Sequence, residues 1–167
     1  YKSGVICDTE FESGKDWSVK DLKNFIDSQN KNCEWIVWSG GEPTDQLTEE
    51  IVEYFKPYKQ AIECSGIKQP PCNLNWVVLS PKIAEHAILK KWITRRNTEL
   101  HCDELRWVRK TGQDIPNTKI IAQKYYISPH FDGETLNEEN VDYCIELCLK
   151  NPKWSLSMQQ HKLWKVR

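Results

Sequence analysis

The sequence predicts an α/β fold with a mostly parallel sheet, and three observations favour it. Short apolar runs such as 34–38 and 75–79 have the length of buried strands. After their first residue these runs are continuously apolar, as in a parallel sheet covered by helices. They alternate with amphipathic segments such as 44–58 and 137–149, whose apolar residues recur with helical spacing. The 167 residues are too few for a complete eight-stranded barrel, which takes about 250 residues.

The first three expected elements lie between residues 18 and 58. Ser18 can cap a helix that runs to about residue 30. The buried strand 34–38 follows, and small residues end it abruptly. The next helix, 44–58, carries acidic residues near its start, where they complement the helix dipole, and Pro57 marks its end.

The middle of the chain is expected to contain four strands and one helix. The strand 60–64 is closed by a serine and a glycine, and the strand 75–79 follows a loop with paired prolines. Residues 83–92 are expected to be helical. The segment 104–108 alternates between polar and apolar residues, as a strand does, and 119–127 is expected to be the next strand.

The last predicted helix, 137–149, is amphipathic, and Asn137 is suited to cap it. One apolar stripe is expected to face the core: Val141, Ile145 and Leu149. The tail from residue 154 is expected to hold a short strand and then a polar, aromatic end. No repeat, low-complexity tract or linker divides the chain, so one domain is expected.

The charge balance excludes some classes of partner. Lys and Arg together number 23 and Asp and Glu number 24, which gives a net charge of −1. Nucleic acids and anionic membranes select a large basic excess, and no apolar run approaches the roughly 20 residues that span a bilayer. We therefore expect neither a direct nucleic-acid partner nor a membrane.

The cysteine pattern indicates a reducing compartment. The seven cysteines are odd in number and include no C-x-x-C pair. A disulfide framework usually has an even count in a shorter chain, and a closed zinc site needs four closely spaced ligands. A cytoplasmic protein is therefore expected. Cys144 and Cys148 lie four residues apart on the last helix, where an apolar packing pair is expected.

The start of the sequence predicts a longer parent polypeptide. The chain begins at Tyr1, its only methionine is Met158, and residues 1–7 lack the apolar stretch of a signal peptide. We therefore expect a single domain spanning 1–167 that is incomplete on its N-terminal side.

Four predicted strands end in small residues beside polar groups. These ends are 39–43, 63–66, 80–82 and 128–130. Because the carboxyl ends of parallel strands share one edge of a sheet, the four ends are expected to converge on one ligand pocket. Gly40 and Gly41 let a ligand approach the main chain and can offer it free backbone groups. For Glu42, a ligand contact is favoured over a role in starting the next helix.

Four colinear motifs carry a resemblance to a known family. They are C-D-T-E-F at 7–11, S-G-G-E-P at 39–43, S-P-K at 80–82 and W-S-L-S-M-Q-Q-H-K at 154–162. Together they resemble the 7-carboxy-7-deazaguanine synthases, a family of radical S-adenosylmethionine enzymes. The G-G-E-P motif is general to the radical superfamily, whereas the first and last motifs are closer to this one family. The resemblance covers almost the whole chain.

The resemblance implies a partial (βα) barrel, here without its first strand, and a homodimer. A [4Fe–4S] cluster would cleave S-adenosylmethionine to a deoxyadenosyl radical, with a flavodoxin-like or other reductant as partner. That radical would convert the pterin substrate, 6-carboxy-5,6,7,8-tetrahydropterin, to 7-carboxy-7-deazaguanine with loss of ammonia, in queuosine and deazapurine biosynthesis. Such enzymes leave the difficult step to the cofactor, while the protein positions it.

The resemblance also implies roles for individual residues. Cys7 would be a cluster ligand, and Thr9 would help to hold a Mg²⁺ ion. Ser39 and the chain-terminal Arg167 would contact the substrate. The S-adenosylmethionine contacts would come from the strand ends: Gly40, Gly41, Glu63, Ser80, Pro81, Lys82, Ser128 and Pro129.

Two alternatives stay open because the cluster motif departs from the family pattern. The family has a cysteine three residues before the one that matches Cys7, and that position is Gly4 here. A cubane cluster with one open iron needs three thiolates. The chain could therefore be a degenerate or truncated homologue that binds a ligand or a protein without radical chemistry. It could also be another radical S-adenosylmethionine enzyme, such as an activating enzyme.

Overall fold

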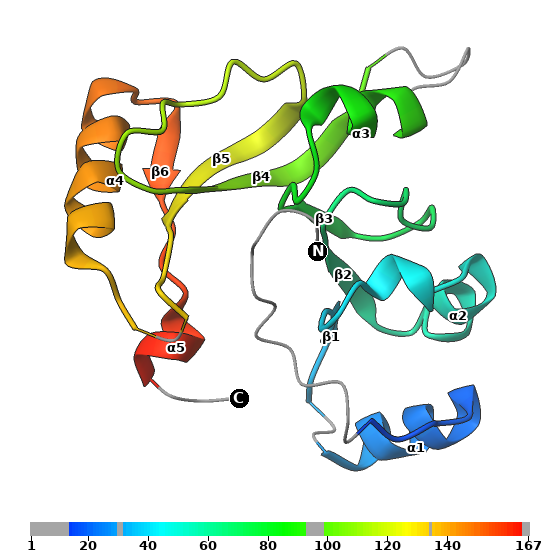
Figure 1. Cartoon of the computed structure of the whole chain (residues 1–167). Helices are drawn as coiled ribbons and strands as arrows, with labels where there is room; N and C mark the ends of the chain where they lie inside the picture. Colours follow the sequence, from blue (N-terminus) through cyan, green and yellow to red (C-terminus); the bar gives the residue numbers. More distant parts are fainter. Residues whose placement is uncertain (1–13, 30–31, 93–98, 134, 165–167) are drawn as a thin grey trace.

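The described part of the chain is built on one six-stranded sheet. The computed structural model describes residues 14–29, 32–92, 99–133 and 135–164. All neighbouring strands are parallel, and their order in the sheet follows their order in the chain (Figure 1). The strands are β1 (Trp35–Trp38), β2 (Lys59–Cys64), β3 (Trp76–Leu79), β4 (His101–Arg109), β5 (Ile121–Pro129) and β6 (Trp154–Leu156).

In the described ranges, five α-helices and one short 3-10 helix accompany this sheet. They are α1 (Val19–Gln29), η1 (Pro43–Asp45), α2 (Glu49–Tyr54), α3 (Glu85–Trp92), α4 (Glu138–Lys150) and α5 (Gln160–Trp164). Figure 1 shows α1 and α2 beside β1 and β2 at one end of the sheet and α4 beside β6 at the other. The predicted α/β class is confirmed, and an open parallel sheet whose strand order follows the chain is consistent with the expected partial (βα) barrel.

The two faces of the sheet differ in chemistry, and strand register shows it. On one face, which we call the outer face, Leu79, Leu105, Tyr125 and Trp154 form a row across four paired strands. This row belongs to the hydrophobic core, together with Ile88 of α3 and Cys144 of α4. Burial of these side chains against the helices supplies the main stabilising free energy of the fold.

The predicted helix 44–58 is wrong in its extent. The chain instead forms η1, leaves helical geometry, and begins α2 at Glu49. The cause is Thr48, which has extended backbone angles and caps α2, its Oγ accepting from the Ile51 N–H at 3.4 Å. Ser18 and Asn137 cap α1 and α4 as predicted, since their side-chain oxygens accept backbone N–H groups three residues on.

The apolar stripe predicted for the last helix is also wrong. Ile145 is 39% exposed and Leu149 is 77% exposed. The buried residues of α4 are Asn140, Cys144 and Leu147. Cys148 is partly buried and packs against the core with Cys144, so the predicted packing pair is confirmed. The face of α4 that packs against the sheet therefore includes a polar residue, Asn140. Its side chain forms hydrogen bonds there with Thr111 and with the His130 carbonyl.

Smaller differences concern element ends. The strand β4 extends beyond the predicted range 104–108 at both ends, and β5 is displaced toward the C-terminus from the predicted range 119–127. The helix α5 was not predicted. The β2–β3 and β4–β5 connections contain no helix among the described residues, yet they join parallel strands. Within the described ranges, no helix combines the length and the apolar character that crossing a membrane requires.

Replacing Asn140 by alanine is expected to lower the free energy of unfolding by about 2–4 kcal/mol. The buried amide accepts from the Thr111 N–H at 2.9 Å and donates to the His130 carbonyl at 2.9 Å, so it joins two loops to α4. Urea unfolding measures the change. As a control, Asn137→Ala removes a cap and should cost only about 1 kcal/mol. Equal losses for both variants would contradict the joining role.

Candidate functional site

Glu42 fastens the end of β1 to the end of β2. One carboxylate oxygen accepts from the N–H and the hydroxyl of Thr44, at 3.3 and 2.5 Å. The other oxygen accepts from the Ser65 N–H at 3.0 Å and from the Ser65 hydroxyl. Glu42 also caps η1. Its four hydrogen-bond acceptor positions are therefore filled by the protein. This corrects the expected ligand contact, because Glu42 instead joins the strand ends.

The end of β3 joins the same cluster through the main chain. The Ser80 N–H donates to the Cys64 carbonyl at 2.8 Å, and the Lys82 N–H donates to the Ser65 carbonyl at 3.1 Å. Ser65, which is 8% exposed, thus contacts both neighbouring strand ends. Hydrogen bonds therefore bring the 39–43, 63–66 and 80–82 ends together, as predicted. That the 128–130 end joins them around one ligand pocket stays a prediction.

The glycines after β1 leave room for a ligand. Ser39, Gly40 and Gly41 are exposed. Gly40 has a φ of +82°, and a Cβ built on it would meet nothing within 4 Å. Backbone in this conformation next to open space fits the approach of a polar group such as the amino and carboxylate end of S-adenosylmethionine. At the end of β3, Ser80 and Pro81 are half-buried and Lys82 is exposed.

The remaining predicted site residues are placed differently. Ser128 and Pro129 lie at the carboxyl end of β5 but are fully buried, and the Ser128 hydroxyl finds no hydrogen-bond partner among the described residues. Their proposed ligand contact stays a prediction. Cys7, Thr9 and Arg167 lie outside the described residues.

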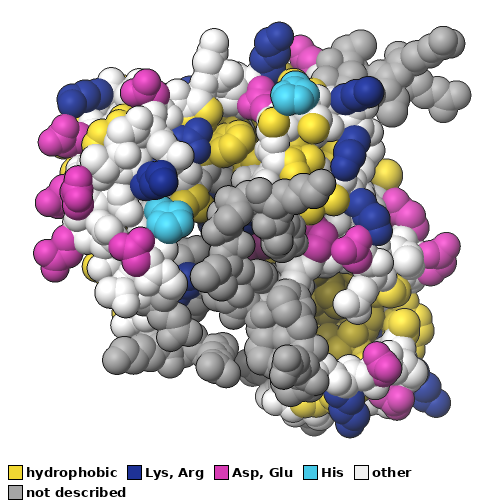
Figure 2. Space-filling view, viewed as in Figure 1, with side chains coloured by type: hydrophobic (Ala, Val, Ile, Leu, Met, Phe, Trp, Pro, Cys, Tyr) yellow, Lys and Arg dark blue, Asp and Glu magenta, His cyan; other side chains and the backbone are white. Residues whose placement is uncertain are grey.

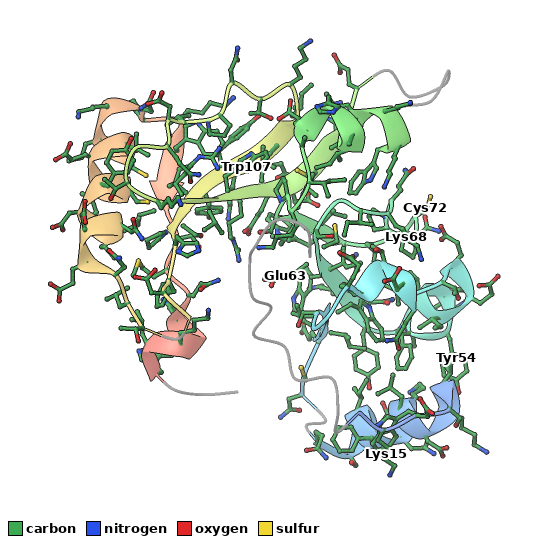
Figure 3. The ribbon with its side chains drawn as sticks, viewed as in Figure 1. Lys15, Tyr54, Glu63, Lys68, Cys72 and Trp107 are labelled. Carbon is green, nitrogen blue, oxygen red and sulfur yellow. The ribbon has the colours of Figure 1, made fainter. Side chains whose placement is uncertain are left out.

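The second sheet face, which we call the inner face, is polar toward its carboxyl edge. Glu63, Val78, Glu104 and Lys124 form one row across paired strands β2 to β5, and Arg106 pairs with Tyr126 in the next row. Figure 3 shows Glu63 on the side of β2 turned toward the β4–β6 part of the sheet. Closed barrels fill this face with apolar side chains, so a charged inner face indicates a ligand surface.

Sequence reasoning missed Glu104, Arg106 and Lys124 as inner-face residues. The sequence signal for them is the alternation of residues 104–108, which predicts a strand and also places Glu104 and Arg106 on one face of it. In a parallel sheet both faces are expected to be apolar, so charges at every second position of a central strand are unusual. That departure points to the face on which a ligand binds.

The described cysteines do not form a cluster site. Cys64, Cys102 and Cys144 are buried, and burial raises the pKa of the first two thiols to about 12 and that of Cys144 to about 11. Across the described ranges, no three His, Cys, Asp or Glu side chains lie together as metal ligands would. The cysteines among the described residues therefore do not supply the ligands of a [4Fe–4S] cluster, and Cys7, the residue that the resemblance assigns to it, lies outside the described ranges.

Alkylation of the native protein is expected to modify Cys33 and Cys72 and to spare Cys64, Cys102 and Cys144. The first two thiols are exposed, and only the thiolate reacts. The negative charge of Glu49 raises the pKa of Cys72. Glu49→Gln should therefore increase the thiolate fraction and the alkylation rate of Cys72 at pH 8, measured by peptide mass spectrometry. Cys33 is the control, and its alkylation rate should be the same in both proteins. If the alkylation rate of Cys72 is also unchanged in Glu49→Gln, the charge of Glu49 does not control the reactivity of Cys72.

Comparison with known proteins gives curated relatives and a solved structure. The chain is 34% identical to a 7-carboxy-7-deazaguanine synthase of Haemophilus influenzae over 169 residues, which cover 94% of this chain and 76% of that protein. It is 26% identical to a 7-carboxy-7-deazaguanine synthase of Bradyrhizobium diazoefficiens, covering 97% and 78%. No protein-family model matches the chain.

The fold is similar to the crystal structure of QueE from Escherichia coli. The TM-score is 0.58 at 21% identity, over 86% of this chain and 64% of that chain. This chain therefore spans less than two thirds of that solved structure. At 34% identity over most of its length to a curated relative, the chain belongs to the 7-carboxy-7-deazaguanine synthase family.

Proposed function

We propose that this chain is a 7-carboxy-7-deazaguanine synthase, a radical S-adenosylmethionine lyase. Its reaction would convert 6-carboxy-5,6,7,8-tetrahydropterin to 7-carboxy-7-deazaguanine and ammonia. Family membership supports the proposal. The observation that carries it is the joining of three strand ends by Glu42 and Ser65 next to the exposed glycine turn at residues 40–41, where a Cβ on Gly40 would meet nothing within 4 Å.

The joined strand ends would bind S-adenosylmethionine, which supplies the hydrogen-abstracting chemistry when bound. The backbone of Gly40 and Gly41 would hold its amino and carboxylate end, and Ser39 would face the pterin. Ser80, Pro81 and Lys82 would contact the nucleoside from the end of β3. Glu63 would contact it from β2, which lies between β1 and β3. These ends are fixed to one another before any ligand binds, so little ordering is needed on binding.

Further parts of the proposal concern residues outside the described ranges and partners. Cys7 would ligate a [4Fe–4S] cluster, Thr9 would contribute an oxygen ligand to Mg²⁺, and Arg167 would contact the substrate. Hard cations such as Mg²⁺ prefer oxygen ligands. We also propose a cytoplasmic homodimer that receives electrons from a flavodoxin-like or other reductant.

Anaerobic incubation with the carboxylated tetrahydropterin, S-adenosylmethionine and a reductant tests the proposal. Formation of 7-carboxy-7-deazaguanine, detected by mass spectrometry, is the expected result. Formation of deoxyadenosine without the deazapurine acid would favour another radical S-adenosylmethionine enzyme. Iron reconstitution before the assay, followed by absorbance, reports separately whether the protein assembles a cluster.

One sequence observation favours a second candidate function. Gly4 occupies the position at which the family pattern has a cysteine. A homologue of this kind would bind the nucleoside or pterin without radical chemistry. Ligand binding together with a colourless protein and no product, after reconstitution, would establish this candidate instead.

A further inference from the structure

Arg106 connects two carboxylates across the inner face of the sheet. Its Nη2 donates to Glu104 Oε2 at 2.9 Å on the same strand. Its Nη1 lies 3.6 Å from Glu63 Oε1, two strands away. The guanidinium therefore bridges β3, whose Val78 lies between these strands and is 5% exposed.

The anchor end of this contact chain is rigid. The side chain of Glu104 is only 15% exposed, and its other oxygen accepts from the indole N–H of Trp76 at 3.1 Å. The Arg106 guanidinium also lies 5.8 Å from the centre of the Tyr126 ring. A guanidinium held by a bound carboxylate and an aromatic face has few alternative rotamers.

The ligand end is open. The Glu63 side chain is 46% exposed, and within the described ranges its one ion pair is the long contact to Arg106. A carboxylate accepts up to four hydrogen bonds, so Glu63 keeps capacity for donors on a ligand. The Arg106 Nε–H is buried without a partner, so the network is not saturated by the described chain.

We propose that Arg106 is a positioning residue that aims the Glu63 carboxylate at the hydrogen-bond donors of the bound nucleoside. This inference rests on the proposed function, because it takes the strand ends to hold S-adenosylmethionine. Glu104 and Trp76 fix the guanidinium, the guanidinium fixes Glu63, and Glu63 contacts the ligand. Pre-orientation of this kind removes the cost of ordering Glu63 when the ligand arrives.

Titration calorimetry with S-adenosylhomocysteine on the full chain tests the inference without requiring turnover. Glu63→Gln and Arg106→Gln are each expected to weaken binding about tenfold, as loss of a charge-assisted hydrogen bond does. Arg106→Lys should restore part of the affinity, because it keeps the charge but not the fork. The double variant should be no weaker than Glu63→Gln alone, since Arg106 acts through Glu63.

Arg109→Gln is the matched control. Arg109 lies on the same strand, and its side chain bonds to the carbonyls of Asp114 and Val108 rather than to Glu63 or Glu104. Thermal unfolding without ligand checks that each variant is folded. The control should bind as tightly as the wild type.

Three results would overturn the inference. An unchanged affinity in Arg106→Gln refutes it and leaves the proposed function standing. Additive losses in the double variant show that Arg106 contacts the ligand by itself. Absence of binding by the wild type refutes both the inference and the S-adenosylmethionine site. This outcome differs from failure of the inference alone, in which the wild type binds the ligand and only the Arg106 variants behave differently from the expectation.

Discussion

Replacing Gly66 by alanine is expected to lower the free energy of unfolding by about 2–4 kcal/mol. Gly66 has a φ of +83°, and a Cβ there would lie 2.8 Å from Ile88 Cδ1 and 3.0 Å from Leu79 Cδ1. Both neighbours are fully buried, so neither can move away freely. The substitution therefore combines backbone strain with overpacking between the β2 end and α3. Urea denaturation measures the loss.

Gly112→Ala separates the two causes. Gly112 has nearly the same φ, +84°, but a Cβ there would meet nothing within 4 Å. It should cost about 1 kcal/mol, the backbone part alone. Ile88→Val removes the closest atom, so the Gly66→Ala/Ile88→Val double variant should lose less stability than the two single losses added together. Equal losses at Gly66 and Gly112 would contradict the packing account.

Replacing Glu42 by alanine is expected to weaken S-adenosylhomocysteine binding more than tenfold and to cost about 2–3 kcal/mol of stability. The change leaves the N–H groups of Thr44 and Ser65 without their acceptor and frees the end of β1 from the end of β2. Calorimetry and thermal unfolding measure the two effects. Binding is expected to weaken because the glycine turn loses its fixed position when the end of β1 is freed from the end of β2.

Glu49→Ala is the control for Glu42. Its carboxylate also accepts a loop N–H, that of Cys72, at 2.7 Å, but it contacts none of the three joined strand ends. It should reduce stability without changing ligand affinity. If both variants bind the ligand as the wild type does, Glu42 does not organise the site.

The fold class could be predicted because apolar strand-sized runs and helical periodicity are local signals. Element ends depended on single capping contacts. Thr48 interrupted the helix expected at 44–58, and nothing in the apolar periodicity of that segment shows this. The buried face of α4 was mispredicted because it includes a polar residue, Asn140. Its amide bonds to Thr111 and His130, which are distant in sequence, and helical periodicity does not show such bonds.

The site was predictable in position but not in its internal bonding. The strand ends at 39–43, 63–66 and 80–82 followed from the parallel sheet rule and the motifs. That Glu42 would bond to Ser65 rather than to a ligand required the register of β1 against β2. The Glu63–Arg106–Glu104 contacts span three strands, so they follow from strand order, which the sequence pattern leaves open.

Figure 2 shows apolar side chains in several places on this face of the molecule, among them the α1 and α2 end and the surroundings of α3. A separate cavity of about 210 Å³ lies elsewhere and is lined by residues including Pro70, Trp92 and Leu100. It contains none of the joined strand ends. A ligand bound in this cavity would leave the joined strand ends unchanged. The cavity therefore serves as an internal comparison for a hydrogen–deuterium exchange experiment.

Hydrogen–deuterium exchange with and without S-adenosylmethionine tests most directly whether the joined strand ends are the binding site. The account predicts slower exchange in peptides containing 39–43, 63–66 and 80–82, with no change in the peptide containing 69–74. Protection confined to 69–74 and residues around Trp92, with the three strand ends unaltered, would contradict it.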